Sequence, residues 1–125
     1  MSLRRLVLAG IIGVSLGAVV APVLYAQAGP PAYLVAEIDV TDAALYKQYL
    51  DKGGPLYAKF AGRFLVRGGT IETFAGEPPK RSVIAVFDSL AQARAFRDSP
   101  AYQELVPLRD RASTFRAYIV EGVAN

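Results

Sequence analysis

The chain has 125 residues, of which 14 are basic and 11 acidic, and it contains neither cysteine nor histidine. This length allows one domain at most. Without cysteine there is no disulfide, thiolate metal site or thiol nucleophile, and without histidine the usual general base near neutral pH is missing. Ser-His-Asp hydrolysis and histidine-ligated zinc or haem are therefore excluded, and we expect neither a metal nor a cofactor.

Residues 1–28 have the pattern of an export signal. A short basic start precedes an uncharged apolar stretch, and residues 26–28, Ala-Gln-Ala, have the small-x-small form of a signal-peptidase site. We therefore expect an exported protein, periplasmic or secreted. The alternative is an uncleaved anchor, because the apolar run is close to the lower limit for a membrane-spanning helix. Contact with a membrane is expected only through this leader, if it is retained.

Removal of the leader changes the charge of the chain. Cleavage would take away Arg4 and Arg5, leaving 12 of the 14 basic residues against the 11 acidic ones. The mature protein would then be nearly neutral. A nucleic-acid partner would require a basic stripe on the domain itself, so we expect no nucleic-acid binding.

The first half of the mature chain predicts a strand followed by a helix. A stiff lead-in covers residues 29–32, and we place the domain at residues 33–123. The segment from Tyr33 to Val40 is rich in β-branched and aromatic residues and precedes a turn signal, which predicts a strand. Thr41 or Asp42 can then cap a helix by accepting a backbone N–H in its first turn.

The expected helix carries one apolar stripe, formed by Leu45, Tyr49, Leu56 and Phe60. The sequence Gly-Gly-Pro at residues 53–55 interrupts it. Proline removes an intrahelical hydrogen bond, so we expect either a kink or two short helices.

The second half predicts three strands and further helical segments. Strands are expected over residues 63–74, 81–87 and 115–123, the first two joined as a hairpin. Ser89 begins a capping-box pattern, and Pro100 opens another short helix. The expected inward residues are Leu90, Ala93, Phe96, Tyr102, Leu105 and Leu108. The order strand, helix, strand, strand, helix, strand predicts an α+β, ferredoxin-like sandwich with a four-stranded antiparallel sheet and its helices on one face.

The expected central strands are apolar on both faces, as the stretch from Ser82 to Phe87 illustrates. Two helices cover only one face of a four-stranded sheet, and an open face is normally polar. A large uncovered apolar face usually marks an interface. We therefore expect a homodimer with the sheets face to face and with Ile84, Val86 and Ile119 between them. The alternative is a modestly apolar face left open to solvent.

Several segments resemble the domain-of-unknown-function family numbered 1330. The most specific are GRFLVRGG and SPAYQ, and RSVIAVFDSLAQARAF and YIVEGV extend the resemblance, which runs from Tyr33 to Val123. It implies a dimeric α/β barrel, in which the sheet of a ferredoxin-like protomer packs on a partner's sheet. The family implies no settled activity. Many members begin directly at the first strand, so the leader is a departure from the pattern.

The segment GRFLVRGG carries the main candidate site residues. Regular pleating would place Arg63 and Arg67 on the uncovered face with Leu65, and Phe64 and Val66 under the helices. A glycine pair follows Arg67, which predicts a bulge that either re-aims the neighbouring side chains or curves the strand around a partner.

Two interpretations of these arginines remain open. One pairs an arginine with Glu37 or Asp39, within or across protomers. The other makes Arg67 a clamp for a carboxylate or phosphate. Tyr49 and Tyr102 are the best pocket candidates among the tyrosines, since each has an apolar ring and a polar tip.

Three functional hypotheses follow. The first is an exported homodimer that binds a small anionic or aromatic molecule, with ligand-binding candidates Arg63, Arg67, Glu37, Tyr49 and Tyr102. The second is an enzyme that resembles cofactor-free monooxygenases of the same structural group, although a shared fold does not carry a function. The third is a purely structural assembly module. No catalytic residue can be named, and the sheet lacks the aromatic ladder of an RNA-binding module.

Overall fold

The computed structural model describes residues 29–124, so the expected leader at residues 1–28 lies outside the described part of the chain. Within residues 29–124, no helix is both long and apolar enough to span a membrane. The elements in chain order are β1 (Ala32–Val40), α2 (Ala43–Lys59), β2 (Arg63–Arg67), β3 (Arg81–Phe87), α3 (Leu90–Asp98), α4 (Pro100–Gln103), α5 (Val106–Ala112) and β4 (Ser113–Glu121).

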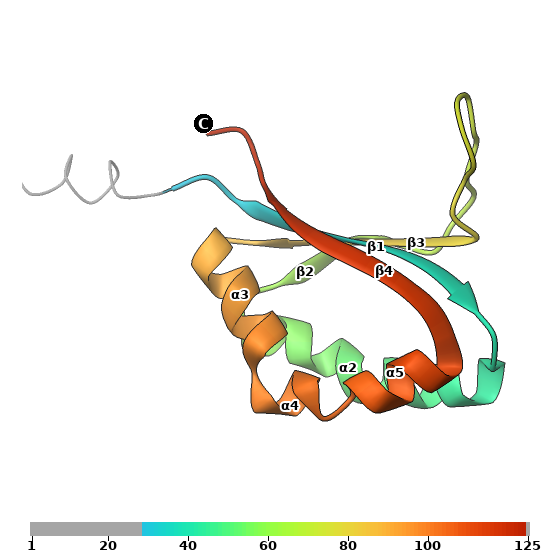
Figure 1. Cartoon of the computed structure of the whole chain (residues 1–125). Helices are drawn as coiled ribbons and strands as arrows, with labels where there is room; N and C mark the ends of the chain where they lie inside the picture. The colour runs from blue at the N-terminus through green and yellow to red at the C-terminus, as the bar shows by residue number, and fades with distance from the viewer. Residues whose placement is uncertain (1–28, 125) are drawn as a thin grey trace, which may run out of the picture.

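The strands form one antiparallel sheet in the order β2-β3-β1-β4. All the helices in the described part of the chain lie on one side of this sheet, and the other side is left open (Figure 1). The structure therefore confirms the predicted ferredoxin-like α+β architecture. The helical layer is more divided than expected, because α3, α4 and α5 together form the second helical region.

The core lies between the sheet and the helices. Alternate residues of β1 are buried, because β1 is a central strand and one of its faces lies under the helices. Phe87 of β3 and Phe96 of α3 are the largest fully buried side chains. Tyr57 of α2 packs with its ring centroid 4.3 Å from that of Phe96. Such aromatic pairs contribute about 0.5–1.5 kcal/mol beyond the area that they bury.

Helix α2 begins after a capping residue and continues through Gly53 and Gly54. Asp42, rather than Thr41, is the N-cap, and its side chain accepts a hydrogen bond from Leu45 N at 3.0 Å. The helix is one segment that contains Pro55, so the two-helix alternative is wrong. Proline lacks only its own N–H, and packing of the flanking turns against the core outweighs this loss.

The caps of the later helices follow the sequence signals. Ser89 accepts a hydrogen bond from Gln92 N at 3.1 Å, which is the expected first half of a capping box. Ser99 both ends α3 and begins α4: its hydroxyl donates to Phe96 O at 2.8 Å and accepts from Tyr102 N at 3.2 Å. Ser99 thus fixes Tyr102 relative to the aromatic core.

The open face of the sheet carries apolar residues, as predicted, but Ile119, which was predicted to lie on this face, does not. Ile119 pairs with buried Leu34 and so faces the helices. Tyr118 and Val120 are the residues of β4 on the open face, where they are 52% and 47% exposed. Val86 does lie on the open face, opposite Tyr33, but it is only 6% exposed within a single protomer.

β2 and β3 pair as the expected antiparallel hairpin, but the first strand is shorter than predicted. β2 ends at Arg67 rather than at Phe74, and residues 68–80 leave the sheet. They project on the side opposite the helices (Figure 1). We call residues 69–79 the arm.

Candidate functional site

A β-bulge in β2 decides the direction of Arg67. Phe64 pairs with Ala85 and Val66 pairs with Ile84, which leaves Leu65 as the extra residue. A bulge reverses the inward-outward alternation of the residues beyond it. Arg67 therefore lies opposite buried Val83, on the same side of the sheet as the helices. The predicted placement of Arg67 on the open face is wrong, and so is that of Val66 under the helices.

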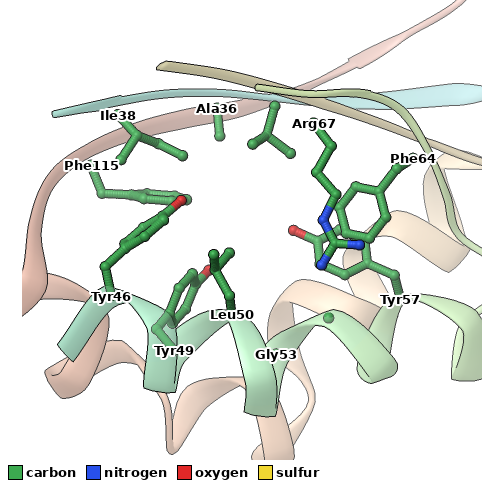
Figure 2. A pocket seen from close by; sticks show the side chains of 12 residues that line it. Ala36, Ile38, Tyr46, Tyr49, Leu50, Gly53, Tyr57, Phe64, Arg67 and Phe115 are labelled. Carbon is green, nitrogen blue, oxygen red and sulfur yellow. The ribbon is translucent and has the colours of Figure 1, made fainter. Parts of the chain in front are cut away.

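The bulge precedes Arg67 instead of following it at the glycine pair. Figure 2 shows the result: the Arg67 side chain descends from the sheet toward α2, beside Phe64 and Tyr57. Its guanidinium carbon lies 4.3 Å from the centroid of the Phe64 ring. A Cβ on Gly54 of α2 would come within 3.0 Å of an Arg67 nitrogen. Gly54 thus leaves room for the guanidinium against the helix.

Arg67 borders a cavity between the sheet and α2, which we call the arginine cavity. Its volume is about 20 Å³, which is room for about one water molecule. Its walls are mostly apolar and aromatic. They are formed by Ala36, Ile38, Tyr46, Tyr49, Leu50, Gly53, Gly54, Tyr57, Phe64, Arg67, Val83 and Phe115.

A second arginine, Arg81, also lies on the helix side of the sheet. Arg81 pairs with Ile38 and so points toward the helices, and its guanidinium carbon lies 5.8 Å from the centroid of the Tyr46 ring. A Cβ on Gly68 would lie 2.7 Å from an Arg81 nitrogen, and Gly68 has a φ of 79°. This glycine thus combines a left-handed backbone conformation with the space that Arg81 occupies.

Two polar groups, one in the wall of the arginine cavity and one beside it, lack partners among residues 29–124. Tyr46 Oη lines the cavity and Arg81 Nε lies near the Tyr46 ring, and both are buried without a hydrogen bond. In the part of the chain that the structure describes, neither Arg67 nor Arg81 forms an ion pair. A buried polar group without a partner costs about 1–3 kcal/mol. A site with this pattern is suited to an anion that accepts hydrogen bonds.

Tyr49 and Tyr102, the two pocket candidates among the tyrosines, lie in contact with each other. Their hydroxyl oxygens are 2.8 Å apart, and Arg109 donates a hydrogen bond to the Tyr102 hydroxyl at 3.3 Å. Burial is the main reason that the pKa of Tyr49 is raised far above its usual 10.0, and the neighbouring Tyr102 is the second reason. Burial likewise raises the pKa of Tyr57, and the positive charge of Arg67 opposes part of that rise. Both phenols are therefore neutral at physiological pH.

These two tyrosines separate the arginine cavity from a second one. Tyr49 lines the first, whereas Tyr102 lines a cavity of about 200 Å³ under β4. Phe115 contributes to both walls. Arg109 places its guanidinium carbon 4.7 Å from the centroid of the Phe115 ring, at the polar end of the second cavity.

The other two candidates lie away from the arginine cavity. Glu37 is on the open face, where it forms an ion pair with Arg116 of the neighbouring strand. Arg63 is exposed opposite Val86. Glu37 thus pairs with an arginine, as one interpretation expected, but with Arg116 rather than with Arg63 or Arg67. The structure therefore brings Arg67 and Tyr49 together and leaves Glu37 and Arg63 on the other face.

Sequence reasoning missed Arg81 and Tyr46. The signal for Arg81 was present, because strict alternation from Val83, Ala85 and Phe87 places Arg81 on the helix side. Tyr46 lies three residues before Tyr49 on α2, a spacing that puts both rings on one helix face. Their ring centroids are 5.8 Å apart.

Fold and site together define a small ferredoxin-like domain with a cavity under its sheet, Arg67 in the cavity wall and Arg81 on the neighbouring Tyr46 ring, and neither arginine forms an ion pair within residues 29–124. Residues 31–123 match the family model described as a domain of unknown function (DUF1330). The chain belongs to this family. A search of curated proteins found no match.

Solved structures with similar folds have low sequence identity. A protein of unknown function from Rhodopseudomonas palustris has a TM-score of 0.62 at 19% identity, over 75% of this chain and 83% of that one. SnoaB, a cofactor-independent oxygenase from Streptomyces nogalater, has a TM-score of 0.56 at 16% identity, over 75% and 94%. A dimeric ferredoxin-like protein of unknown function from Thermobifida fusca has a TM-score of 0.51 at 17% identity, over 75% and 92%. At such identities the similarity establishes the fold alone.

Proposed function

We propose that this domain binds a small anionic molecule through Arg67 and Arg81, acts as a homodimer and works outside the cytoplasm. The observation that carries the binding proposal is the pair of arginines on the helix side of the sheet, without acidic partners among the described residues. Guanidinium groups present planar donor pairs that match carboxylate and phosphate oxygens.

The two arginines lie close enough in the sheet to act on one ligand. Arg67 is opposite Val83, and Arg81 is two residues from Val83 along β3. Such diagonal positions on paired strands lie about 7–8 Å apart, within reach of long side chains. The unpartnered hydroxyl of Tyr46, beneath Arg81, would complete the set of donors.

The size of the cavity limits how much of the ligand enters. A volume of about 20 Å³ holds an oxygen-sized group and no aromatic ring. We therefore place the anionic group of the ligand between the arginines. The rest of the ligand lies toward solvent, past Arg67, which is exposed at the edge of the sheet.

Calorimetric titration of the domain with carboxylates, phosphates and phenols tests this proposal. Arg67→Ala and Arg81→Ala should each weaken anion binding by about tenfold or more, the effect of losing a charge-assisted hydrogen bond. Arg63→Ala, on the opposite face, is the matched control and should bind as the wild type does. Equal binding by all three variants would contradict the proposal.

Self-association is supported by the uncovered apolar face and by the dimeric state named for the Thermobifida fusca neighbour. Sedimentation at micromolar concentration should give a dimer. A monomer at that concentration would contradict this part of the proposal.

Export is supported by the sequence of residues 1–28 alone. Expression of the full chain, followed by fractionation and N-terminal sequencing, should recover a protein outside the cytoplasm that begins at Gly29. Recovery of the full chain in the membrane fraction would favour the anchor alternative.

The alternative function is that of a cofactor-free oxygenase, and the similarity to SnoaB is the observation that favours it. The test is oxygen consumption in the presence of phenolic compounds, compared between the wild type and Arg67→Ala. Consumption that depends on Arg67 would establish catalysis, whereas anion binding without consumption would leave the binding function.

A further inference from the structure

The arm, residues 69–79, has an apolar tip without a partner. Phe74 is 101% exposed, and no side chain within residues 29–124 covers it. Ile71, nearer the base, is also exposed. A benzyl side chain that passes from water into a protein surface gains about 1.5–3 kcal/mol, so a fully exposed phenylalanine on a projecting segment is costly unless something covers it.

The arm is fixed at its base, and the leg that returns to β3 is stiff. Gly68 N donates a hydrogen bond to Ser82 O at 2.9 Å, and Lys80 forms an ion pair with Asp39 at 3.2 Å. Pro78 and Pro79 restrict the returning leg to extended conformations. Within the described residues, no backbone hydrogen bond joins the two legs of the arm. The sheet therefore holds the arm outward, and nothing folds its tip back.

The arm stands on the side of the sheet that carries the uncovered apolar residues (Figure 1). Tyr118 and Val120 are on that face, each about half exposed. The arm and this face therefore lie on the same side of the protomer. A second copy packed on the face would meet the arm as well.

The length of the arm exceeds the spacing of two packed sheets. Its outgoing leg, residues 69–74, can extend to about 20 Å at about 3.3–3.6 Å per residue. Sheets that pack face to face are about 10 Å apart. The tip of the arm would then pass beyond the partner's sheet and lie against its edge and helical layer.

We propose that the arm clasps a second copy of this chain, with Phe74 buried against the partner protomer. In a two-fold symmetric dimer the contact occurs twice, so both tips contribute. This clasp requires the self-association proposed above, and it adds an anchor outside the sheet-to-sheet contact. It also gives the long segment between β2 and β3 a function that the protomer alone does not explain.

A single tryptophan tests the burial of the tip, because the chain contains none. Phe74→Trp should emit at the short wavelengths of a buried indole in the dimer and shift to long wavelengths on dilution to the monomer. Ala91→Trp, on the exposed surface of α3, is the control and should emit as an exposed indole at all concentrations. Exposed emission from Phe74→Trp in a sample that sediments as a dimer would overturn the clasp.

A second variant measures the contribution of the tip. Phe74→Ser should raise the dimer dissociation constant by about tenfold or more, given the transfer free energy of a benzyl group. Thr73→Ser, its neighbour in the arm, should leave the constant unchanged. An unchanged dissociation constant for Phe74→Ser would overturn the clasp and leave the dimer in place. A monomeric wild type would overturn both.

Discussion

The two faces of the sheet differ in the kind of group that has no partner. On the helix side, apolar groups pack closely, but the hydroxyl of Tyr46 and Nε of Arg81 are buried without partners among the described residues. On the open side, Glu37 pairs with Arg116 and Asp39 with Lys80, while no described residue fully covers apolar side chains such as Tyr118. Unmatched polar groups are suited to a ligand, and unmatched apolar area is suited to a protein surface. The two faces of one sheet are therefore suited to different partners, a small anion on the helix side and a protein surface on the open side.

The largest expected effect comes from Val86→Asp. Val86 is buried in the protomer even though it lies on the open face, so an unpaired carboxylate there should cost about 3 kcal/mol or more of unfolding free energy. Urea unfolding measures this loss.

Val120→Asp is the matched control for Val86→Asp. Because Val120 is half exposed in the protomer, its replacement should dissociate the dimer with little change in protomer stability. Equal destabilisation by the two variants, measured on the monomer, would mean that the open face is not an interface distinct from the core.

Two glycine substitutions test whether Arg81 takes part in anion binding on the helix side of the sheet. Gly68 and Gly69 both have a positive φ, so alanine at either position should cost about 1–2 kcal/mol in unfolding free energy. A Cβ at Gly68 would also meet Arg81, whereas a Cβ at Gly69 would meet nothing within 4 Å. Gly68→Ala should therefore weaken anion binding and Gly69→Ala should not. Similar affinities for the two variants would remove Arg81 from the site.

A smaller effect is expected at high pH. Burial raises the pKa of Tyr49 in the folded protein above its ordinary 10.0. The unfolded chain therefore loses this proton first. The contribution of Tyr49 to stability is fully present below about pH 10 and decreases as the pH rises further. The unfolding free energy of Tyr49→Phe should depend less steeply on pH above 10 than that of the wild type. Parallel curves would show that Tyr49 is not the titrating group.

The parts of the fold that follow from regular periodicity could be predicted. β1 alternates between buried and partly exposed residues over most of its length, so its two sides follow from the sequence. The caps at Asp42 and Ser89 follow from local side-chain chemistry. Ile119 was misplaced because β4 carries apolar residues on both faces, and its register with Leu34 is a property of the tertiary pairing.

The candidate site was less predictable because it depends on an irregularity. The residues from Arg63 to Arg67 alternate regularly in the sequence, and the bulge at Leu65 arises only from pairing with β3. The glycine pair signalled a backbone departure in this region, but its role at Gly68 is to admit Arg81 from the next strand. The strand predicted over residues 63–74 includes the first half of the arm, because Ile71, Thr73 and Phe74 are residue types that favour strands. Such propensity carries no information on where pairing with β3 ends, which is at Arg67.

The bulge at Leu65 has a consequence for chain length in this family. Leu65 is the residue of β2 that has no counterpart on β3, so the pairs that Phe64, Val66 and Arg67 form with β3 would all remain if it were deleted. A relative shorter by one residue at this point would form a regular strand, with its arginine two positions after Phe64 and still on the helix side. A chain of the same length that paired with β3 without the bulge would instead turn its arginine toward the apolar side chains of the open face. The inserted residue is therefore tolerated only together with the irregular pairing that absorbs it.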